Sequence, residues 1–304
     1  MIRIFRGMEP PSLAQVRTVE LTKLRDLEKE RPITGDDVDG YRVVARELWE
    51  MQYAKCCYCE MKVTAIYNDV EHFRPKGRAD RGPGCTQDHG YFWLSFTWEN
   101  LLFACPLCNR TGKNDRFPLK NGSRPLLAWE MPPGKERLLL LDPAVEQGVE
   151  HIEFVPRTRS PRPGHESTWQ DVDRWTATPR GASERGKYSI EVFGMNHEQL
   201  QDLYLNHVRD TVRPCYEGIR RAIDAPDRSA RKERRVQEEV RRAKDTLFTR
   251  SVPFVGLSYD ALRFFVPSSR ITPFGATWPG PRGVGTRPPQ RSHHPMHPNR
   301  RALP

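Results

Sequence analysis

The sequence predicts an α+β protein, in which short strands held by two cysteine pairs are followed by a helical region. Six of the seven cysteines fall between residues 56 and 108, where short β-like runs alternate with turns. From about residue 182 to residue 250, apolar residues instead recur at helical spacing. The segments that we expect are a lead-in over 1–35, a cysteine-rich domain over 36–120, strands and a polar connector over 121–181, a helical region over 182–266 and a tail over 267–304.

Composition limits the class of protein. Lys and Arg number 49 against 39 Asp and Glu, so the net charge is +10, which favours a polyanionic partner such as nucleic acid. No apolar run approaches the roughly 18 residues of a membrane span, and the first residues carry no apolar stretch long enough for a signal peptide. An odd cysteine count without an export signal favours reduced thiols. We therefore expect a cytoplasmic protein with no membrane contact.

The first two segments differ in helical pattern. Charged residues, prolines and short apolar runs alternate over 1–35, so we expect this lead-in to be poor in helix. A helix is expected to begin at Asp36 and to deliver the chain to the first cysteine pair. Its apolar residues follow the spacing of one helix face: Tyr41, Val44, Ala45 and Leu48.

Strands are expected at four places. Residues 63–67 and 91–96 are rich in β-branched and aromatic residues, with a Gly/Asp/Pro loop between them. Residues 138–141 and 151–155 look like two further strands around a turn. The polar stretch over 157–181 is expected to be a connector.

The C-terminal third contains an expected helical region with a basic run, followed by a segment rich in proline and arginine. Helices are expected over 182–250, and residues 228–244 carry eight basic and three acidic side chains, for a net charge of +5. This run is explained by a solvated helix face, with a phosphate-contacting helix as the alternative. Residues 267–304 hold nine of the 27 prolines and six arginines but no Asp, Glu or Lys, so we expect a disordered tail.

Two C-x-x-C units predict a metal site. Cys56 and Cys59 form the first unit, and Cys105 and Cys108 form the second, 45 residues further on. Each unit turns two thiolates toward one ion, and two units complete the tetrahedron that zinc prefers. The alternative is two buried or redox-active pairs without metal.

The remaining cysteines are expected to stay outside this site. Cys57 sits inside the first unit and should face away from the ion, and Cys85 and Cys215 are most simply unliganded. Zinc held by four thiolates is coordinatively saturated and does no chemistry. Any reaction must therefore come from the residues that the zinc holds together.

Those residues resemble the HNH (ββα-metal) nuclease motif. Glu71, His72 and Pro75 match its acid-His-x-x-Pro signature, Asn100 matches its central Asn, and Asn109 matches its third position, where Asn often replaces His. A basic Gly-Lys turn follows at residues 112–113. Glu71 departs from the more frequent Asp and reaches one methylene further. The resemblance implies a zinc-stapled ββα-metal core with a flanking N-terminal helix.

The resemblance also implies a mechanism, single-metal hydrolysis of a phosphodiester. Glu71 and Asn109 would hold a catalytic Mg²⁺ or Mn²⁺, distinct from the structural Zn²⁺, because oxygen donors suit those ions. Neutral His72 would take a proton from the attacking water, and Asn100 would hold the loop that aims its imidazole. Six basic residues crowd the motif as candidate phosphate contacts: Arg74, Lys76, Arg78, Arg110, Lys113 and Arg116.

The layout over roughly residues 1–210 is similar to one branch of this superfamily, the PtuB-type nucleases of Septu anti-phage systems and of some retrons. That resemblance implies DNA as the substrate and an ATPase partner of the PtuA type. The chain has no G-x-x-x-x-G-K-[ST] loop of its own. The segments that carry the likeness are 6–11, 55–60, 71–76, 93–94, 98–101, 105–110, 141–143, 151–154 and 193–196.

Two other functions remain open at this point. A catalytically silent zinc module that binds nucleic acid or a partner would use the same cysteines and basic surface. An RNA- or tRNA-directed nuclease would use the same motif, because a metal site that contacts only phosphate does not distinguish the polymer. Only an enzyme needs Glu71, His72 and Asn109 to converge at one cation.

Overall fold

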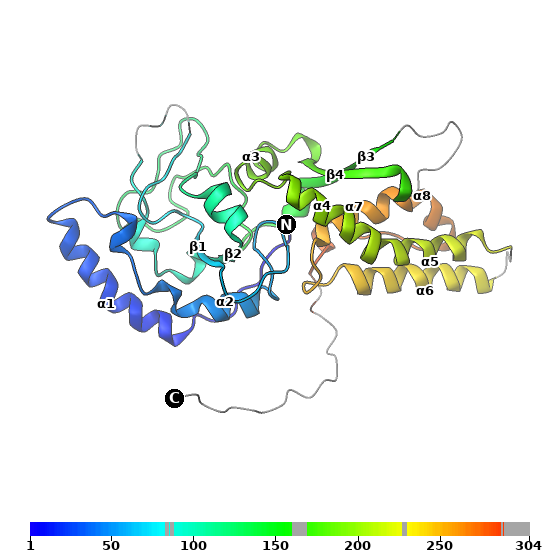
Figure 1. Ribbon diagram of the computed structural model, residues 1–304, viewed down its shortest axis with the longest axis horizontal. Helices are drawn as coiled ribbons and strands as arrows, with labels where there is room; N and C mark the ends of the chain where they lie inside the picture. The colour runs from blue at the N-terminus through cyan, green and yellow to red at the C-terminus, as the bar shows by residue number, and fades with distance from the viewer. Residues whose placement is uncertain (83–84, 86–87, 160–168, 227–229, 287, 289–304) are drawn as a thin grey trace, which may run out of the picture.

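A computed structural model describes residues 1–82, 85, 88–159, 169–226, 230–286 and 288. Within this part of the chain, helices combine with two separate two-stranded sheets, so the structure is a mixture of helix and sheet as expected. Helix α1 (Pro11–Glu28) and the cysteine-rich segment lie toward one end of an elongated molecule, and a helical hairpin lies at the other (Figure 1). Over the described residues, no helix is both long enough and apolar enough to cross a membrane.

The lead-in contains a long helix, so the expectation of a helix-poor segment is wrong. Helix α1 (Pro11–Glu28) begins with a proline, whose missing N–H costs nothing at the first helical position. Only Leu13 and Leu24 are buried, and they lie three turns apart on one face. Because two apolar contacts in eighteen residues make a weak periodic pattern, the helix depends on packing against the segment that begins at Tyr41.

The helix expected from Asp36 is present in three pieces. The 3₁₀ turns η1 (Gly35–Asp37) and η2 (Tyr41–Val44) come first, and helix α2 (Ala45–Met51) follows. Gly40 separates the two turns with a φ of 85°, a left-handed conformation that glycine adopts readily. Val44 and Leu48 are fully buried, so α2 is a core helix that leads directly to the first cysteine pair.

A short antiparallel sheet and a helical segment form the cysteine-rich region. Strand β1 (Asp69–His72) pairs with β2 (Leu101–Ala104), and the helical segment η5 (Leu107–Lys113), of the π type, follows β2. All eight strand residues are buried, so neither strand shows the alternation of buried and exposed residues that marks a half-exposed sheet.

The strands expected at 63–67 and 91–96 are absent from these described segments. Ile66 and Tyr67 are exposed, with no neighbouring strand to pair with. The second segment instead forms the 3₁₀ turn η3 (Phe92–Leu94), followed by η4 (Trp98–Asn100). Its aromatic residues are buried, but they fill the core from a turn, because packing overrides β-propensity.

The second sheet lies in the connector. Strand β3 (Ile152–Thr158) confirms the strand expected at 151–155, and it pairs with β4 (Val172–Pro179) in the stretch expected to be a connector. Trp175 is fully buried, while its neighbours along β4 are mostly half-exposed and polar. Residues 138–141 form no strand, although three leucines there are buried. Three 3₁₀ turns flank the sheet: η6 (Gly148–Glu150), η7 (Trp169–Asp171) and η8 (Arg180–Ala182).

The helical region is confirmed. Its members are α3 (Glu184–Val192), α4 (Glu198–His207), the π-type turn η9 (Val208–Val212), α5 (Arg213–Asp224), α6 (Ala230–Leu247) and α7 (Val255–Phe265). Helices α5 and α6 lie side by side as the hairpin at the far end of the molecule (Figure 1). Residues 230–244 of the basic run fall on α6, and residues 228–229 lie outside the described part of the chain. The buried residues of α6 are Val236, Val240, Ala243 and Leu247, so most of its arginines face solvent.

The first part of the expected disordered tail is folded, so that expectation is wrong for residues 267–286. Helix α8 (Ser268–Ile271) is followed by the 3₁₀ turns η10 (Thr272–Phe274) and η11 (Pro281–Gly283). Trp278 is buried, and its indole N–H donates to the carbonyl oxygen of Val266 at 2.9 Å. Residues 287 and 289–304 lie outside the described part of the chain.

Candidate functional site

The two cysteine pairs come together as expected. The thiol sulfurs of Cys56, Cys59, Cys105 and Cys108 all lie within 4.8 Å of one another, and all four residues are buried. The Sγ atoms of Cys59 and Cys105 are 3.9 Å apart. Four sulfurs at about 2.3 Å from a tetrahedral zinc ion would be about 3.8 Å apart, so these four side chains could hold zinc. Among the described residues they are the sole group of three or more His, Cys, Asp or Glu side chains so arranged.

Backbone contacts tie each pair to the sheet. In the first knuckle, residues 56–59, the Cys56 amide donates to the Met61 carbonyl and the Glu60 amide donates to the Cys56 carbonyl. The Cys57 amide donates to the carbonyl oxygen of Phe103 on β2 at 3.0 Å. The second knuckle, residues 105–108, follows β2 directly, so a bound ion would join α2, β2 and η5.

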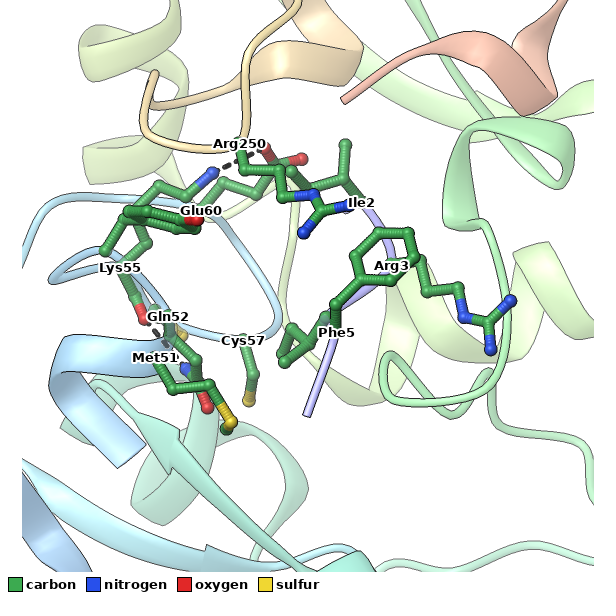
Figure 2. Close-up of a pocket in the computed structure, with 12 residues that line it drawn as sticks. Ile2, Arg3, Phe5, Met51, Gln52, Lys55, Cys57, Glu60 and Arg250 are labelled. Carbon is green, nitrogen blue, oxygen red and sulfur yellow. Dashed lines mark hydrogen bonds and ion pairs between the residues drawn. The ribbon is translucent and has the colours of Figure 1, made fainter. Parts of the chain in front are cut away.

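Cys57 stands apart from this cluster, as expected. It lines a cavity of about 40 Å³ together with Phe5 and Met51 (Figure 2). The guanidinium of Arg250 lies over the Phe5 ring at 3.5 Å from its centroid, at the other side of this cavity. Cys85 and Cys215 are half-buried and likewise lie outside the cluster.

Glu71 is held by one group from the first knuckle and one from η5, the segment that contains the end of the second knuckle. Successive residues of a strand point to opposite faces, so Asp69 and Glu71 share one face of β1. The Tyr58 hydroxyl donates to Glu71 Oε1 at 3.0 Å, and the Lys113 ammonium lies 2.8 Å from the same oxygen. Burial raises the pKa of the Glu71 carboxyl, and the nearby Lys113 ammonium opposes that rise.

Asn109 contacts Asp69 rather than Glu71. Its amide nitrogen donates to Asp69 Oδ2 at 3.1 Å, and the Arg110 guanidinium donates to both oxygens of the same carboxylate, at 2.9 and 2.6 Å. Sequence reasoning missed Asp69, although its position two residues before Glu71 places it on the same face of the strand. The structure thus gathers two carboxylates and one amide on one side of β1.

His72 is buried on the opposite face of β1. Its Nε2 lies 3.0 Å from the Ser95 carbonyl oxygen, which can only accept, so Nε2 carries the hydrogen and Nδ1 is the unprotonated nitrogen. The Tyr41 ring packs edge-on against the imidazole at 4.5 Å between centroids. Burial, with the nearby ammonium of Lys76, lowers the pKa of His72 to about 3. The imidazole is therefore neutral at neutral pH.

Asn100 braces the loop that follows His72. Its amide oxygen accepts from the Arg74 backbone amide at 2.7 Å, and its amide nitrogen donates to the Arg74 carbonyl at 3.1 Å and to the Leu94 carbonyl at 3.2 Å. Its own carbonyl accepts from the Phe73 amide at 2.9 Å. These bonds join the end of β1 to the start of β2, which is the placement that the sequence predicts for this side chain.

Four of the six basic candidates are engaged inside the protein, which corrects the expectation of an open cluster of phosphate contacts. Lys113 is fully buried against Glu71, and the buried Arg74 pairs with Glu136 at 3.0 Å. Lys76 donates to two backbone carbonyls before η2, and Arg116 donates to the carbonyls of Gly112 and Val192. Each has an acidic or carbonyl partner that is distant in sequence and becomes a neighbour only in the fold.

Arg78 and Arg110 are the two candidates that reach solvent. Their side chains are 68% and 64% exposed. Arg78 pairs with the equally exposed Asp88 at 3.2 Å, and Arg110 pairs with Asp69. The exposed Arg78–Asp88 pair is of the weak kind, so Arg78 could exchange its partner for a phosphate. Arg110 is held more firmly, because it bonds both oxygens of the buried Asp69 carboxylate.

Two curated proteins are similar to this chain in sequence. Septu protein PtuB of Bacillus mycoides (strain KBAB4) is 30% identical over 211 residues, which is 66% of this chain and 65% of that protein. The chain resembles PtuB. A second Septu protein PtuB, from Bacillus thuringiensis, is 36% identical over 84 residues, or 27% of this chain and 28% of its own length. The chain thus spans about two thirds of the length of the first PtuB. No family model and no solved structure matches the chain.

Proposed function

We propose that the chain is a metal-dependent endonuclease that hydrolyses DNA phosphodiester bonds at an HNH-type site. The observation that supports this most is that groups from the first knuckle and from the segment after the second knuckle contact Glu71 and Asp69, while His72 lies on the opposite face of the same strand. Tyr58 reaches Glu71 from the first knuckle, and Asn109 and Lys113 reach the two carboxylates of β1 from the segment that follows the second knuckle. The chain order of β1, β2 and the π-type segment η5 supports a ββα unit in this proposal.

The donors on one side of β1 suit a hard cation. Glu71 and Asp69 offer carboxylate oxygens, and Asn109, whose nitrogen is bound to Asp69, would offer its amide oxygen. Mg²⁺ or Mn²⁺ held there would stabilise the charge that develops on the scissile phosphate and on the departing 3′ oxygen. The four cysteines would hold a separate Zn²⁺ that keeps the two knuckles together.

His72 would act as the general base. Its hydrogen bond to Ser95 fixes the tautomer that leaves Nδ1 able to accept a proton from water. Asn100 holds the loop after His72 through both its amide atoms, so the imidazole keeps one orientation during the reaction. Arg78 and Arg110 would contact the DNA backbone.

The biological setting that we propose is anti-phage defence in company with an ATPase. The support is the similarity to two proteins named Septu protein PtuB. The sequence has no phosphate-binding G-x-x-x-x-G-K-[ST] loop, so nucleotide hydrolysis would have to come from the partner.

A plasmid-nicking assay tests the nuclease. The zinc-loaded chain is incubated with supercoiled DNA and Mg²⁺ or Mn²⁺, alone and together with an ATPase of the PtuA type. We expect the wild type to cut and His72→Ala to lose at least about 100-fold in rate, because a general base contributes 10²–10⁴. His89→Ala is the matched control, since His89 is exposed and its imidazole Nε2 bonds the carbonyl of Leu126, away from Glu71 and Asn109.

Two results would count against this proposal. One is equal cutting by wild type and His72→Ala, and the other is no cutting by the wild type under either condition. The substrate is identified by testing single-stranded DNA, duplex DNA and RNA in parallel. Cleavage of RNA alone would show that the chain is an RNA-directed nuclease and not a DNA endonuclease.

A catalytically silent zinc module is the second candidate, and the Lys113–Glu71 ion pair favours it. That ammonium contacts the carboxylate oxygen at 2.8 Å and neutralises its charge without any added cation. A silent module predicts that the chain retards DNA in a gel-shift assay and that neither Mg²⁺ nor Mn²⁺ produces nicks.

A further inference from the structure

One side chain connects the first cysteine knuckle directly to the candidate catalytic carboxylate. Tyr58 lies between Cys57 and Cys59, and its hydroxyl donates to Glu71 Oε1 at 3.0 Å. Its side chain is completely buried, and its ring stacks on Phe193 with 3.9 Å between centroids and 13° between planes. The phenol therefore has little freedom to turn away from Glu71.

The backbone that carries Tyr58 is equally constrained. Cys56 and Cys59, two and one positions away, belong to the four-cysteine cluster. The intervening Cys57 amide is bonded to the Phe103 carbonyl on β2. A metal ion bound by the cysteines would therefore set the position of the Tyr58 hydroxyl as well as that of the thiolates.

A group of the first knuckle and a group of the segment after the second knuckle meet at the same oxygen of Glu71. Tyr58 donates to Oε1 at 3.0 Å, and the Lys113 ammonium lies 2.8 Å from it. Two donors on Oε1 restrict the rotation of the carboxylate, so Oε2 is the oxygen better placed to coordinate a cation. Groups that orient a ligand in this way typically change metal affinity by 10–100-fold when they are removed.

We propose that Tyr58 is a positioning residue, whose hydroxyl presents Glu71 to the catalytic cation from the first zinc knuckle. The inference rests on the proposed nuclease function, since it assigns Glu71 as a ligand. It adds a physical coupling between two metal sites, because the knuckle that holds zinc also sets the orientation of the carboxylate at the second site.

Tyr58→Phe tests the proposal, because phenylalanine keeps the ring stacked on Phe193 and removes only the hydroxyl. Mn²⁺ binding to the full, zinc-loaded chain is followed by electron paramagnetic resonance, and zinc content by mass spectrometry. We expect the Mn²⁺ Kd to rise about 10-fold or more while one zinc per chain is retained. Tyr204→Phe is the matched control, since Tyr204 is also fully buried and its hydroxyl donates to the Met195 carbonyl at 3.0 Å.

The outcomes separate this inference from the proposed function. If the wild type binds no Mn²⁺, or if Glu71→Gln binds Mn²⁺ as well as the wild type does, the proposed cation site and the role of Tyr58 are both contradicted. If Glu71→Gln abolishes Mn²⁺ binding while Tyr58→Phe keeps the wild-type Kd, only the role of Tyr58 is contradicted. An equal loss in Tyr204→Phe would also overturn it, because the effect would then be a general one of losing a buried hydroxyl.

A second variant covers the case in which Tyr58→Phe loses zinc. Phe193→Leu keeps the hydroxyl but removes the ring on which Tyr58 stacks. We expect a rise of several-fold in the Mn²⁺ Kd with zinc retained, and an unchanged Kd would overturn the proposal.

Discussion

The Lys113 ammonium lies 2.8 Å from Glu71 Oε1, and the two side chains are only 0% and 5% exposed. The same ammonium donates to the His72 carbonyl oxygen at 2.9 Å. Lys113 thus ties η5 to β1 by an ion pair and a charge-assisted hydrogen bond, both withdrawn from water. Removing one partner of such a pair leaves a buried charge uncompensated.

Lys113→Met should therefore lower the free energy of unfolding by about 3–5 kcal/mol. Adding Glu71→Gln to this variant should restore part of the loss, because no unpaired carboxylate remains. Urea unfolding of the zinc-loaded proteins measures both. Lys120→Met is the control, since Lys120 pairs with Glu184 on the surface, where such a pair contributes at most about 1 kcal/mol. Equal losses in the two lysine variants would contradict the buried pair.

Cys56 and Cys57 are adjacent but should differ in their importance for zinc. Cys56→Ala removes one of the four converging thiolates, so we expect zinc content to fall well below one per chain and the fold to lose cooperativity. Cys57→Ala removes a sulfur that lines the small cavity, so we expect full zinc content. Zinc analysis after dialysis checks both, and a loss of zinc in Cys57→Ala would show that a different set of thiols binds the ion.

Arg78→Gln should weaken DNA binding and should make the binding constant less dependent on salt concentration. Arg78 is exposed, and removing one cation that neutralises a phosphate should reduce the slope of log K against log salt by about 1. Binding of a DNA duplex at several salt concentrations measures this slope. Arg46→Gln removes the same charge from the exposed face of α2, where Arg46 pairs with Glu50, and serves as the control. The same change of slope in both variants would mean that only net charge matters.

His207 should make the fold sensitive to acid. Burial lowers its pKa from 6.5 to about 4, although Glu60 and Asp210 oppose the shift, and its Nε2 bonds the Ser258 hydroxyl at 2.7 Å. Between these two pH values the unfolded chain binds a proton that the folded chain does not. The contribution of His207 to the free energy of unfolding is therefore fully present above about pH 6.5 and is lost as the pH falls toward 4.

The variant His207→Gln, which cannot titrate, isolates that contribution. Lowering the pH from 7.5 to 5 should cost the wild type about 2 kcal/mol more than the variant. Urea midpoints at the two pH values provide the measurement. Equal losses in the two proteins would show that His207 is not buried as a neutral group.

Local patterns predicted the parts of the site that depend on local geometry. A C-x-x-C turn directs two thiols to one point whatever surrounds it, so Cys56, Cys59, Cys105 and Cys108 were correctly grouped. The contact of Asn100 with the loop after His72 was expected from the resemblance to the HNH motif rather than from local geometry, since its partner Arg74 is 26 residues away. Asp69 was missed because no motif includes it, although strand periodicity puts it beside Glu71.

Other errors arose where burial depends on distant partners. Lys113 and Arg74 are of the residue type that binds phosphate, yet both are buried. Lys113 is paired with the carboxylate of Glu71, and Arg74 is paired with that of Glu136. Trp278 folds part of a segment that is rich in proline and arginine, because its indole finds a carbonyl and a core to pack against. Composition alone cannot show these partners.

The amino-acid sequence by itself determined the pairing of the cysteines within each C-x-x-C unit and the helical character of the region after residue 182, because both follow from spacing within a few turns of chain. The candidate acid, base and amide residues came from the resemblance to the HNH motif and stay a prediction. Only the tertiary structure decided that Tyr58 and Lys113 share one oxygen of Glu71, that Asn109 binds Asp69, and which arginines reach solvent. These contacts to Glu71 and Asp69 join residues 13 to 42 positions apart, and the cost of desolvating a charge is offset only when the fold brings its partner into place.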